Sequence, residues 1–202
     1  MAIKLVLVLD ESGSMGVVRD ATIEGVNSYL NSLEGEIYVS VVKFNTEHLP
    51  LYSGLLLVDA PRLDYDNYHP NGGTALYDAL KWAMENVTLL SHHDKVLIVV
   101  VTDGEDNSSR LTTKDRIIEL IKEKESMNNW TFVYLGANQN AWKFANQMGF
   151  NVGNTLSYDH GETREAMAGL SSATQSYARS NTASTKNFFT PDSSADEDKK
   201  NS

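Results

Sequence analysis

The 202-residue chain contains no cysteine, which excludes disulfide bonds, thiolate metal sites and cysteine nucleophiles. It also lacks an excess of basic residues, because 27 acidic against 17 basic side chains give a formal net charge of -10. Nucleic-acid backbones and anionic membranes attract basic surfaces, so this balance argues against both as partners. The composition predicts a soluble protein that binds neither.

Long apolar runs are missing as well. No run approaches the roughly 20 residues that span a bilayer. The apolar segment near the start is too short for the core of a signal peptide, and it ends in Asp10 instead of a small-residue cleavage site. Together with the absence of cysteine, these features predict a cytoplasmic protein.

The most informative segment is Leu5–Met15, in which an aliphatic run is followed at once by acidic and hydroxyl side chains. An unbroken aliphatic run predicts a strand that helices cover on both faces. Asp10 then lies at the carboxyl end of the strand, where open parallel sheets bind their ligands. Asp10, Ser12 and Ser14 offer three oxygens from one short loop, and Gly13 lets that loop bend sharply. The segment therefore predicts a site for a hard cation.

Strand and helix patterns alternate along the rest of the chain. Strands are predicted at about 36–44, 51–58, 96–101, 131–135 and 151–155, and helices at about 17–33, 76–87, 113–127, around Trp142 and at 167–177. The short polar segment 45–50 predicts that the first two of these strands form an antiparallel hairpin at one edge. The alternation predicts an α/β fold, a doubly wound, Rossmann-like, mainly parallel sheet with one antiparallel edge strand and helices on both faces.

The length fits one domain with a sizeable core. We assign residues 1–180 to this domain. Beyond about Ser180 apolar residues become rare, and Ser, Thr, Asp and Lys dominate. Residues 181–202 are therefore predicted to be a disordered polar tail.

Two later loops repeat the design of the first. Thr74 follows two glycines at the amino end of a predicted helix, which it could also cap, and Asp103 follows the second fully apolar strand. Together the three loops supply two carboxylates and three hydroxyl groups, from Asp10, Ser12, Ser14, Thr74 and Asp103. Oxygen donors with few charges suit Mg²⁺ or Mn²⁺ and do not suit zinc.

This arrangement closely resembles the von Willebrand factor A domain family, whose metal-ion-dependent adhesion site has an Asp-X-Ser-X-Ser motif, a distant Thr and a distant Asp. The motif stands here as Asp10-Glu11-Ser12-Gly13-Ser14, with Thr74 and Asp103 in the other two loops. The resemblance spans about residues 3–155. It implies a metal-dependent protein-binding module in which a Glu or Asp carboxylate of a partner protein completes the coordination of the ion.

For an intracellular, single-domain protein of this family, we expect a role in an assembly or in a stress response. Glu11, Glu105 and Asp106 lie beside the motif residues without matching any motif position. We expect these three acidic side chains to form a solvated rim.

Two alternatives compete with this interpretation. Ser12, Ser14 and Thr74 could each serve as a helix cap or turn former. The chain also resembles haloacid dehalogenase-like phosphatases, in which an Asp such as Asp10 forms an aspartyl-phosphate with magnesium. Those enzymes need a second Asp two residues later, where Ser12 stands, and the sequence has no phosphate loop, dinucleotide fingerprint or nucleophile elbow. We therefore expect no enzymatic activity and no small-molecule substrate.

Overall fold

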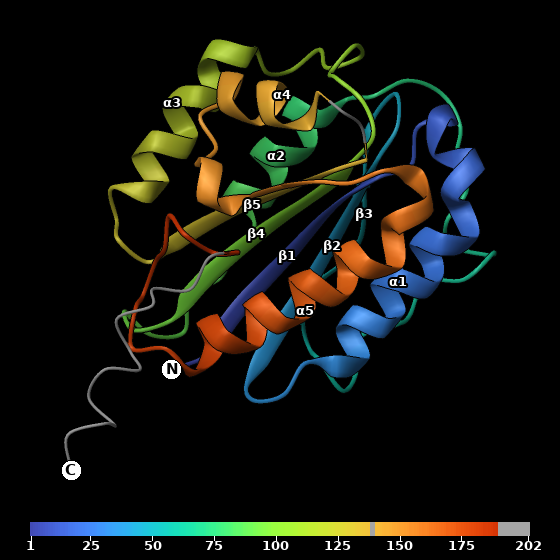
Figure 1. Cartoon of the computed structure of the whole chain (residues 1–202). Helices are drawn as coiled ribbons and strands as arrows, with labels where there is room; N and C mark the ends of the chain where they lie inside the picture. The colour runs from blue at the N-terminus through green and yellow to red at the C-terminus, as the bar shows by residue number, and fades with distance from the viewer. Residues whose placement is uncertain (138–139, 190–202) are drawn as a thin grey trace.

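The computed structural model describes residues 1–137 and 140–189, and Figure 1 shows a central sheet with helices packed on both faces. The strands are β1 (Ile3–Asp10), β2 (Ile37–Phe44), β3 (His48–Leu56), β4 (Lys95–Thr102), β5 (Trp130–Gly136) and β6 (Thr155–Ser157). They lie in the order β3-β2-β1-β4-β5-β6. Only β3 runs antiparallel to its neighbour among these described strands. The predicted fold class is confirmed.

The helices form a layer on each face of the sheet. They are α1 (Arg19–Ser32), α2 (Leu76–Glu85), α3 (Lys114–Glu125), α4 (Ala141–Gln147) and α5 (Thr163–Arg179), with short 3₁₀ turns η1 (Gly13–Val18), η2 (Val152–Asn154) and η3 (His160–Glu162). Helices α2, α3 and α4 cover one face, and α1 and α5 cover the other. Within the described residues, no helix combines the length and the apolar character needed to cross a membrane.

Strands β1 and β4 occupy the centre of the sheet, and every residue of both is buried. Their aliphatic runs require this position, because side chains of both faces need a helix above them. The two strands are parallel and paired in register, with Leu9 opposite Val101. Asp10 and Thr102 therefore reach the same edge of the sheet, together with the loops that follow them.

The last strand differs from its prediction. Residues 152–154 form η2, and β6 begins only at Thr155, where the prediction for 151–155 ends. The side chain of Asn154 donates to the carbonyls of Phe132 and Thr185, at 3.0 and 2.8 Å. These bonds, together with a bond from Thr155 Oγ1 to the carbonyl of Asn151, stabilise a turn where the sequence pattern indicated a strand.

Residues 181–189 pack on the domain instead of forming the start of a solvated tail. Phe188 is only 4% exposed, and its ring lies 5.8 Å from that of Tyr177. The backbone N–H of Phe189 donates to the carbonyl of Gly153 at 3.0 Å. The predicted tail is thus wrong for 181–189, because two aromatic residues among polar ones are enough to anchor the segment. The rest of the predicted tail, 190–202, lies outside the described residues.

Candidate metal centre

Asp10 is the last residue of β1, and its side chain is fully buried. One carboxylate oxygen accepts the backbone N–H of Ser12 at 2.7 Å, and the other accepts the hydroxyl of Thr102. The hydroxyl of Tyr68 donates to the backbone carbonyl of Asp10 at 2.6 Å. These contacts hold the carboxylate in one orientation at the carboxyl edge of the sheet.

The first and third loops meet through hydroxyl groups. Ser12 Oγ lies 3.1 Å from Ser14 Oγ, and Ser14 Oγ donates to a carboxylate oxygen of Asp103 at 2.7 Å. Asp10, Ser12, Ser14 and Asp103 therefore form a continuous chain of polar contacts, as expected for the ends of two adjacent parallel strands.

The second loop places Thr74 beside the third. The backbone N–H of Thr74 donates to the side-chain oxygen of Asn107 at 2.8 Å, and its carbonyl accepts the N–H of Asn107 at 2.9 Å. Its hydroxyl faces Gly104, where an added Cβ would lie 3.8 Å from Thr74 Oγ1. The structure thus brings the five predicted residues together at one edge of the sheet.

Thr74 does not cap α2, contrary to one of the roles that the sequence allowed. The first N–H groups of the helix instead bond to the third loop, from Tyr77 to Asp106 Oδ2 at 3.0 Å and from Asp78 to Ser109 Oγ at 3.1 Å. Residues of a distant loop therefore satisfy the helix end. The Thr74 side chain is not needed for that purpose.

Glycine allows the three loops to approach closely. The N–H of Gly13 donates to the carbonyl of Gly72 at 3.1 Å, and Gly72 has a φ of 69°, which disfavours other residues. At Gly73, an added Cβ would lie 2.1 Å from the hydroxyl of Ser108. A side chain at this position would push the second and third loops apart.

The site combines a buried floor with an open rim. Asp10, Ser12 and Thr74 are buried, Ser14 is exposed and Asp103 is partly exposed. Burial raises the pKa of Asp10 from 3.8 to about 6, and the negative charge of Asp103 adds to the increase, although hydrogen bonds from Ser12 and Thr102 oppose it. Two carboxylates held near each other in this way would be stabilised by a cation between them.

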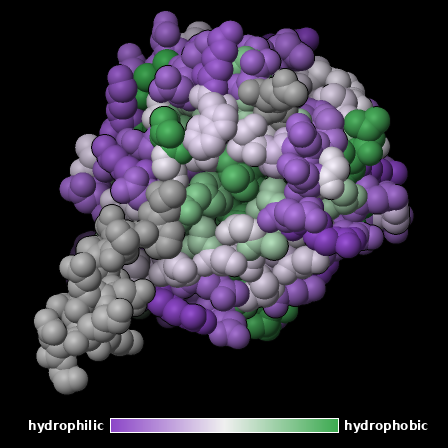
Figure 2. All heavy atoms as spheres, in the orientation of Figure 1, coloured by the Kyte–Doolittle hydropathy of each residue, from purple (hydrophilic) through white to green (hydrophobic). Residues whose placement is uncertain are grey.

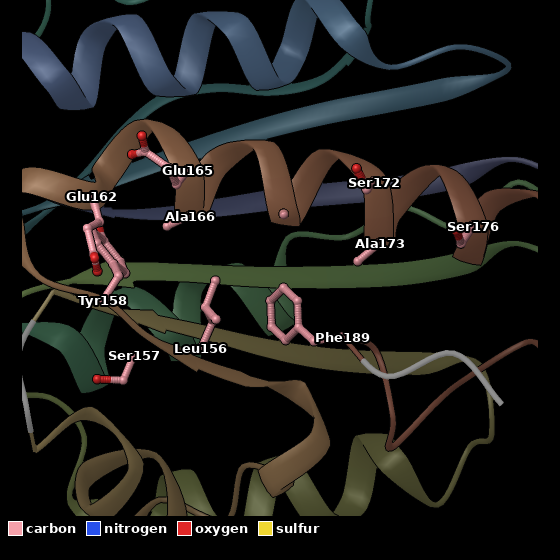
Figure 3. A pocket seen from close by; sticks show the side chains of 11 residues that line it. Leu156, Ser157, Tyr158, Glu162, Glu165, Ala166, Ser172, Ala173, Ser176 and Phe189 are labelled. Atoms are coloured by element: carbon pink, nitrogen blue, oxygen red, sulfur yellow. The ribbon is translucent and has the colours of Figure 1, made fainter. Parts of the chain in front are cut away.

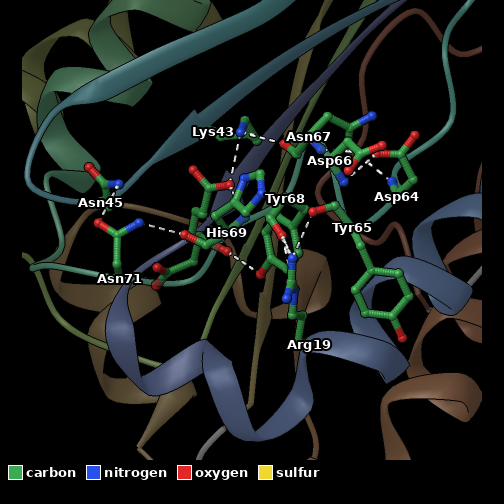
Figure 4. A network of polar contacts seen from close by, with 12 residues as sticks. Arg19, Lys43, Asn45, Asp64, Tyr65, Asp66, Asn67, Tyr68, His69 and Asn71 are labelled. Atoms are coloured by element: carbon green, nitrogen blue, oxygen red, sulfur yellow. Dashed lines mark hydrogen bonds and ion pairs between the residues drawn. The ribbon is translucent and has the colours of Figure 1, made fainter.

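Glu11 is not part of a solvated rim, which corrects its prediction. Its side chain is 2% exposed and lies 2.8 Å from Lys43 Nζ, and it also accepts the backbone N–H of His69. Lys43 in turn donates to the carbonyl of Asn67 (Figure 4). The pairing of β1 with β2 brings this lysine beside the loop. Glu11 therefore anchors the loop after β3 instead of facing solvent.

Glu105 and Asp106, the other two acidic residues beside the motif, differ in their exposure to solvent. Glu105 is exposed, as the rim prediction requires. Asp106 is half-buried and accepts the N–H of Tyr77 at the start of α2 as well as the hydroxyl of Ser109. The rim prediction is thus wrong for Asp106, because a distant helix end needs its oxygens.

Three residues support the site although the sequence did not predict this role for them, namely Thr102, Tyr68 and Asn107. Thr102 ends an apolar strand beside Asp103, so its position at the strand end was a usable signal. Tyr68 and Asn107 lie in irregular loops that follow no spacing rule. Their contacts with Asp10 and Thr74 depend on tertiary folding.

The donor set fits a hard divalent cation. Across the part of the chain that the structure describes, no group of three or more His, Cys, Asp or Glu side chains could hold a metal. The candidate site instead offers two carboxylates and three hydroxyl groups from adjoining loops. Magnesium and manganese accept such oxygen ligands, often with water, whereas zinc prefers nitrogen and sulfur.

Solved structures are similar to this chain in fold. No family model matches the sequence, and no curated protein matches it either. Among solved structures, a von Willebrand factor type A protein from Catenulispora acidiphila is 21% identical with a TM-score of 0.62, over 85% of this chain and 42% of that one. Manganese-loaded TRAP protein from Plasmodium vivax is 20% identical with a TM-score of 0.60, over 82% and 71%.

A third similar structure is proximal thread matrix protein 1 from the mussel byssus, in which zinc occupies the metal-ion-dependent adhesion site (MIDAS) motif. It is 13% identical to this chain with a TM-score of 0.66, and the match covers 86% of this chain and 46% of that one. The chain thus spans less than half the length of the bacterial and mussel proteins. At these identities the likeness concerns the arrangement of strands and helices. The chain has the fold of von Willebrand factor A domains.

Proposed function

We propose that this protein is a divalent-metal-dependent module that binds another protein. Ser12, Ser14 and Thr74 would bind Mg²⁺ or Mn²⁺ directly or through water, and Asp10 and Asp103 would balance its charge. One observation carries the proposal: five oxygen-bearing side chains from three distant loops meet at the carboxyl edge of the sheet. The manganese-loaded and zinc-occupied structures with the same fold support it.

The partner is proposed to present a Glu or Asp carboxylate to the site. A divalent ion held by only two anionic side chains would offer an exchangeable coordination position to such a carboxylate. Exposure of Ser14 and partial exposure of Asp103 leave one side of the site open to it. The surrounding loops, 59–73 and 105–110, carry several acidic residues. The partner surface around its carboxylate is therefore expected to be neutral or basic.

The role is proposed to be non-enzymatic, in an intracellular assembly or a stress response. A phosphatase using Asp10 as nucleophile would need a general acid two residues later, and the hydroxyl of Ser12 stands there, 3.1 Å from Ser14 Oγ. Both oxygens of the Asp10 carboxylate also accept hydrogen bonds, which lowers their nucleophilicity. The cytoplasmic location stays a prediction.

Calorimetric titration of the purified protein with MgCl₂, MnCl₂ and ZnCl₂ tests the metal site. Wild type should bind magnesium or manganese, and Asp10→Ala and Thr74→Ala should lose at least about tenfold in affinity, since each removes an oxygen ligand or its counter-charge. Glu105→Ala is the matched control, because Glu105 is an exposed acid in the same loop as Asp103. The site would be ruled out if wild type and the three variants bound magnesium with one affinity and manganese with one affinity.

A pull-down under crosslinking tests the binding mechanism. Partners should be retained by wild type and Glu105→Ala in magnesium, and should be lost in chelator or with Asp10→Ala. A partner retained by every variant in chelator would contradict the mechanism. An assay with a generic aryl phosphate runs in parallel, and magnesium-dependent turnover that Asp10→Ala abolishes would establish the hydrolase alternative instead.

A further inference from the structure

A groove of about 570 Å³ lies between α5 and β6, which is separated from β1 by β4 and β5. Figure 2 shows apolar side chains gathered in a hollow on this face of the molecule. In Figure 3, Leu156 and Phe189 point toward α5, and Ala166 and Ala173 point from α5 into the same space. The groove is therefore lined largely by apolar side chains, which come from β6, α5 and Phe189.

The layers of the fold explain why this groove exists. On one face α4 packs beside α2 and α3 and contacts β6, so the sheet is covered as far as its last strand. On the other face α5 packs beside α1, with Tyr29 bonded to Thr174 at 3.0 Å, and the described residues provide no helix beyond α5. A helix is about 10 Å across and strands lie about 4.8 Å apart, so a helix beside α5 would cover about two strands.

The side of α5 that borders the groove carries small residues. Gly169, Ser172, Ala173 and Ser176 line it, spaced three and four positions apart so that they share one side of the helix. Small side chains allow another helix to approach closely. An added Cβ at Gly169 would meet nothing within 4 Å, so the space beside it is open.

Charge distinguishes one end of the groove. Glu162 and Glu165 line it at the start of α5, and within residues 1–137 and 140–189 neither forms an ion pair. The side chain of Glu162 accepts the backbone N–H of Asp159 at 3.3 Å, as part of a capping box at this end of the helix. A second copy of this chain, with the same net charge of -10, is repelled from such a surface. A basic segment is attracted to it.

We propose that this groove binds an amphipathic helix of a partner protein, with an apolar face against Leu156, Ala173 and Phe189 and Lys or Arg residues facing Glu162 and Glu165. The helix takes the place beside α5 that the described chain leaves uncovered. The groove extends along α5 from Glu162 to Ser176, about 20 Å at 1.5 Å per residue. None of the five residues of the candidate metal centre lines this groove, and the proposal does not depend on the function proposed for that centre.

Fluorescence anisotropy with a labelled helical peptide tests the proposal on the full chain. The probe is an amphipathic peptide of about 18 residues made of leucine and lysine, long enough to form a helix, and its control is a scrambled peptide of the same composition. Wild type should bind the amphipathic peptide at least about tenfold more tightly than the scrambled one. Chelator should leave this affinity unchanged, which separates the groove from the metal site.

Variants on α5 locate the binding. Gly169→Trp should weaken it at least about tenfold by filling the groove, and unchanged circular dichroism will show that the variant folds. Glu165→Lys should also weaken binding. The controls Glu123→Trp and Glu123→Lys, at an exposed position of α3, should leave it unchanged. Equal binding by wild type and Gly169→Trp, or by the two peptides, would overturn the proposal.

Other occupants have their own signatures in the same experiment. A wild-type dimer in sedimentation that Gly169→Trp dissociates would assign the groove to a second copy. A tenfold gain in peptide affinity on removal of residues 190–202 would assign it to the chain's own carboxyl-terminal segment. Either result would overturn the proposed partner helix, and their absence together with the expected peptide affinities supports it.

Discussion

Asp10 and Glu11 are adjacent acidic residues with different tasks. Asp10 ends β1 and accepts bonds from Ser12 and Thr102, whereas Glu11 turns to Lys43 of the neighbouring strand. Consecutive side chains at a strand end point in different directions, which separates the two carboxylates. One is available to the candidate metal centre, and the other ties the loops together beneath it.

Asp10 should make the metal-free protein less stable as the pH rises. Its pKa is raised from 3.8 to about 6, so the folded state holds the proton more tightly than the unfolded state does. Stabilisation is therefore complete below about pH 4 and is lost as the pH passes about 6, by roughly 3 kcal/mol in total. Urea unfolding in chelator should show this decline for wild type and not for Asp10→Asn. Parallel profiles for the two proteins would contradict it.

The ion pair of Glu11 with Lys43 should matter more than its exposed counterparts. Lys43→Met leaves a buried carboxylate without its cation and should reduce the free energy of unfolding by roughly 3 to 5 kcal/mol. Lys81→Met is the control, because the pair of Lys81 with Glu85 lies on the surface and should contribute less than about 1 kcal/mol.

The double variant Glu11→Gln with Lys43→Met distinguishes loss of packing from an unpaired charge. It should recover part of the stability that Lys43→Met loses, because no buried charge remains. Chemical denaturation of wild type, Lys43→Met, Lys81→Met and the double variant measures these differences in the free energy of unfolding. A double variant no more stable than Lys43→Met would mean that the charge of Glu11 is not the cause.

At the scale of elements, α2 organises the loop after β4. Asp78, in the first turn of α2, accepts the backbone N–H groups of Arg110 and Leu111 at 2.9 and 3.1 Å. Asp106 and Ser109 bond in the opposite direction, to the first N–H groups of the helix. Helix and loop therefore stabilise each other, and Asp103 and Asn107 are positioned as a result.

Asp78→Ala should destabilise the protein by roughly 1 to 3 kcal/mol, because the backbone N–H groups of Arg110 and Leu111 lose their acceptor. It should also weaken magnesium or manganese binding several-fold, since the loop carrying Asp103 loosens. Asp115→Ala, an exposed acid in the first turn of α3, serves as the control and should leave metal affinity unchanged. Denaturation and calorimetry provide the two measurements. Equal metal affinity in both variants would separate the α2 contacts from the site.

At the scale of the whole molecule, the fold brings segments that are distant in the sequence together at two places on the sheet. Parallel strands in the order β3-β2-β1-β4-β5-β6 bring the loops after β1 and β4 to a common edge. At the other side of the sheet, the chain returns after α5 and contacts η2 through Asn154. That return encloses the α5–β6 groove with Phe189.

A chain ending at Ser180 should be less stable than one ending at Phe189. Removing 181–189 exposes the surface that Phe188 covers and leaves the buried Asn154 side chain without two of its partners. The loss should be roughly 3 kcal/mol, about equal to burying one aromatic side chain with its hydrogen bonds. Thermal unfolding of the two chains measures it. Equal stability would show that the segment contributes nothing to the domain.

Much of the fold could be predicted because local patterns coincide with it. The aliphatic runs of β1 and β4 indicated buried central strands, and the polar residues directly after them indicated the edge at which a site forms. The hairpin of β2 and β3 followed from its short polar connection. These predictions succeeded because a strand covered on both faces needs an unbroken aliphatic run, and such a run can be recognised in the sequence alone.

Tertiary structure alone decided the contacts between loops. By itself the sequence determined the fold class and the order of the oxygen donors Asp10, Thr74 and Asp103 along the chain. It could not determine that Glu11 would be buried against Lys43, that Tyr68 would bond to Asp10, or that 181–189 would return to the sheet. Such contacts join residues with no regular spacing, and the free energy that selects them arises only once packed strands bring them together.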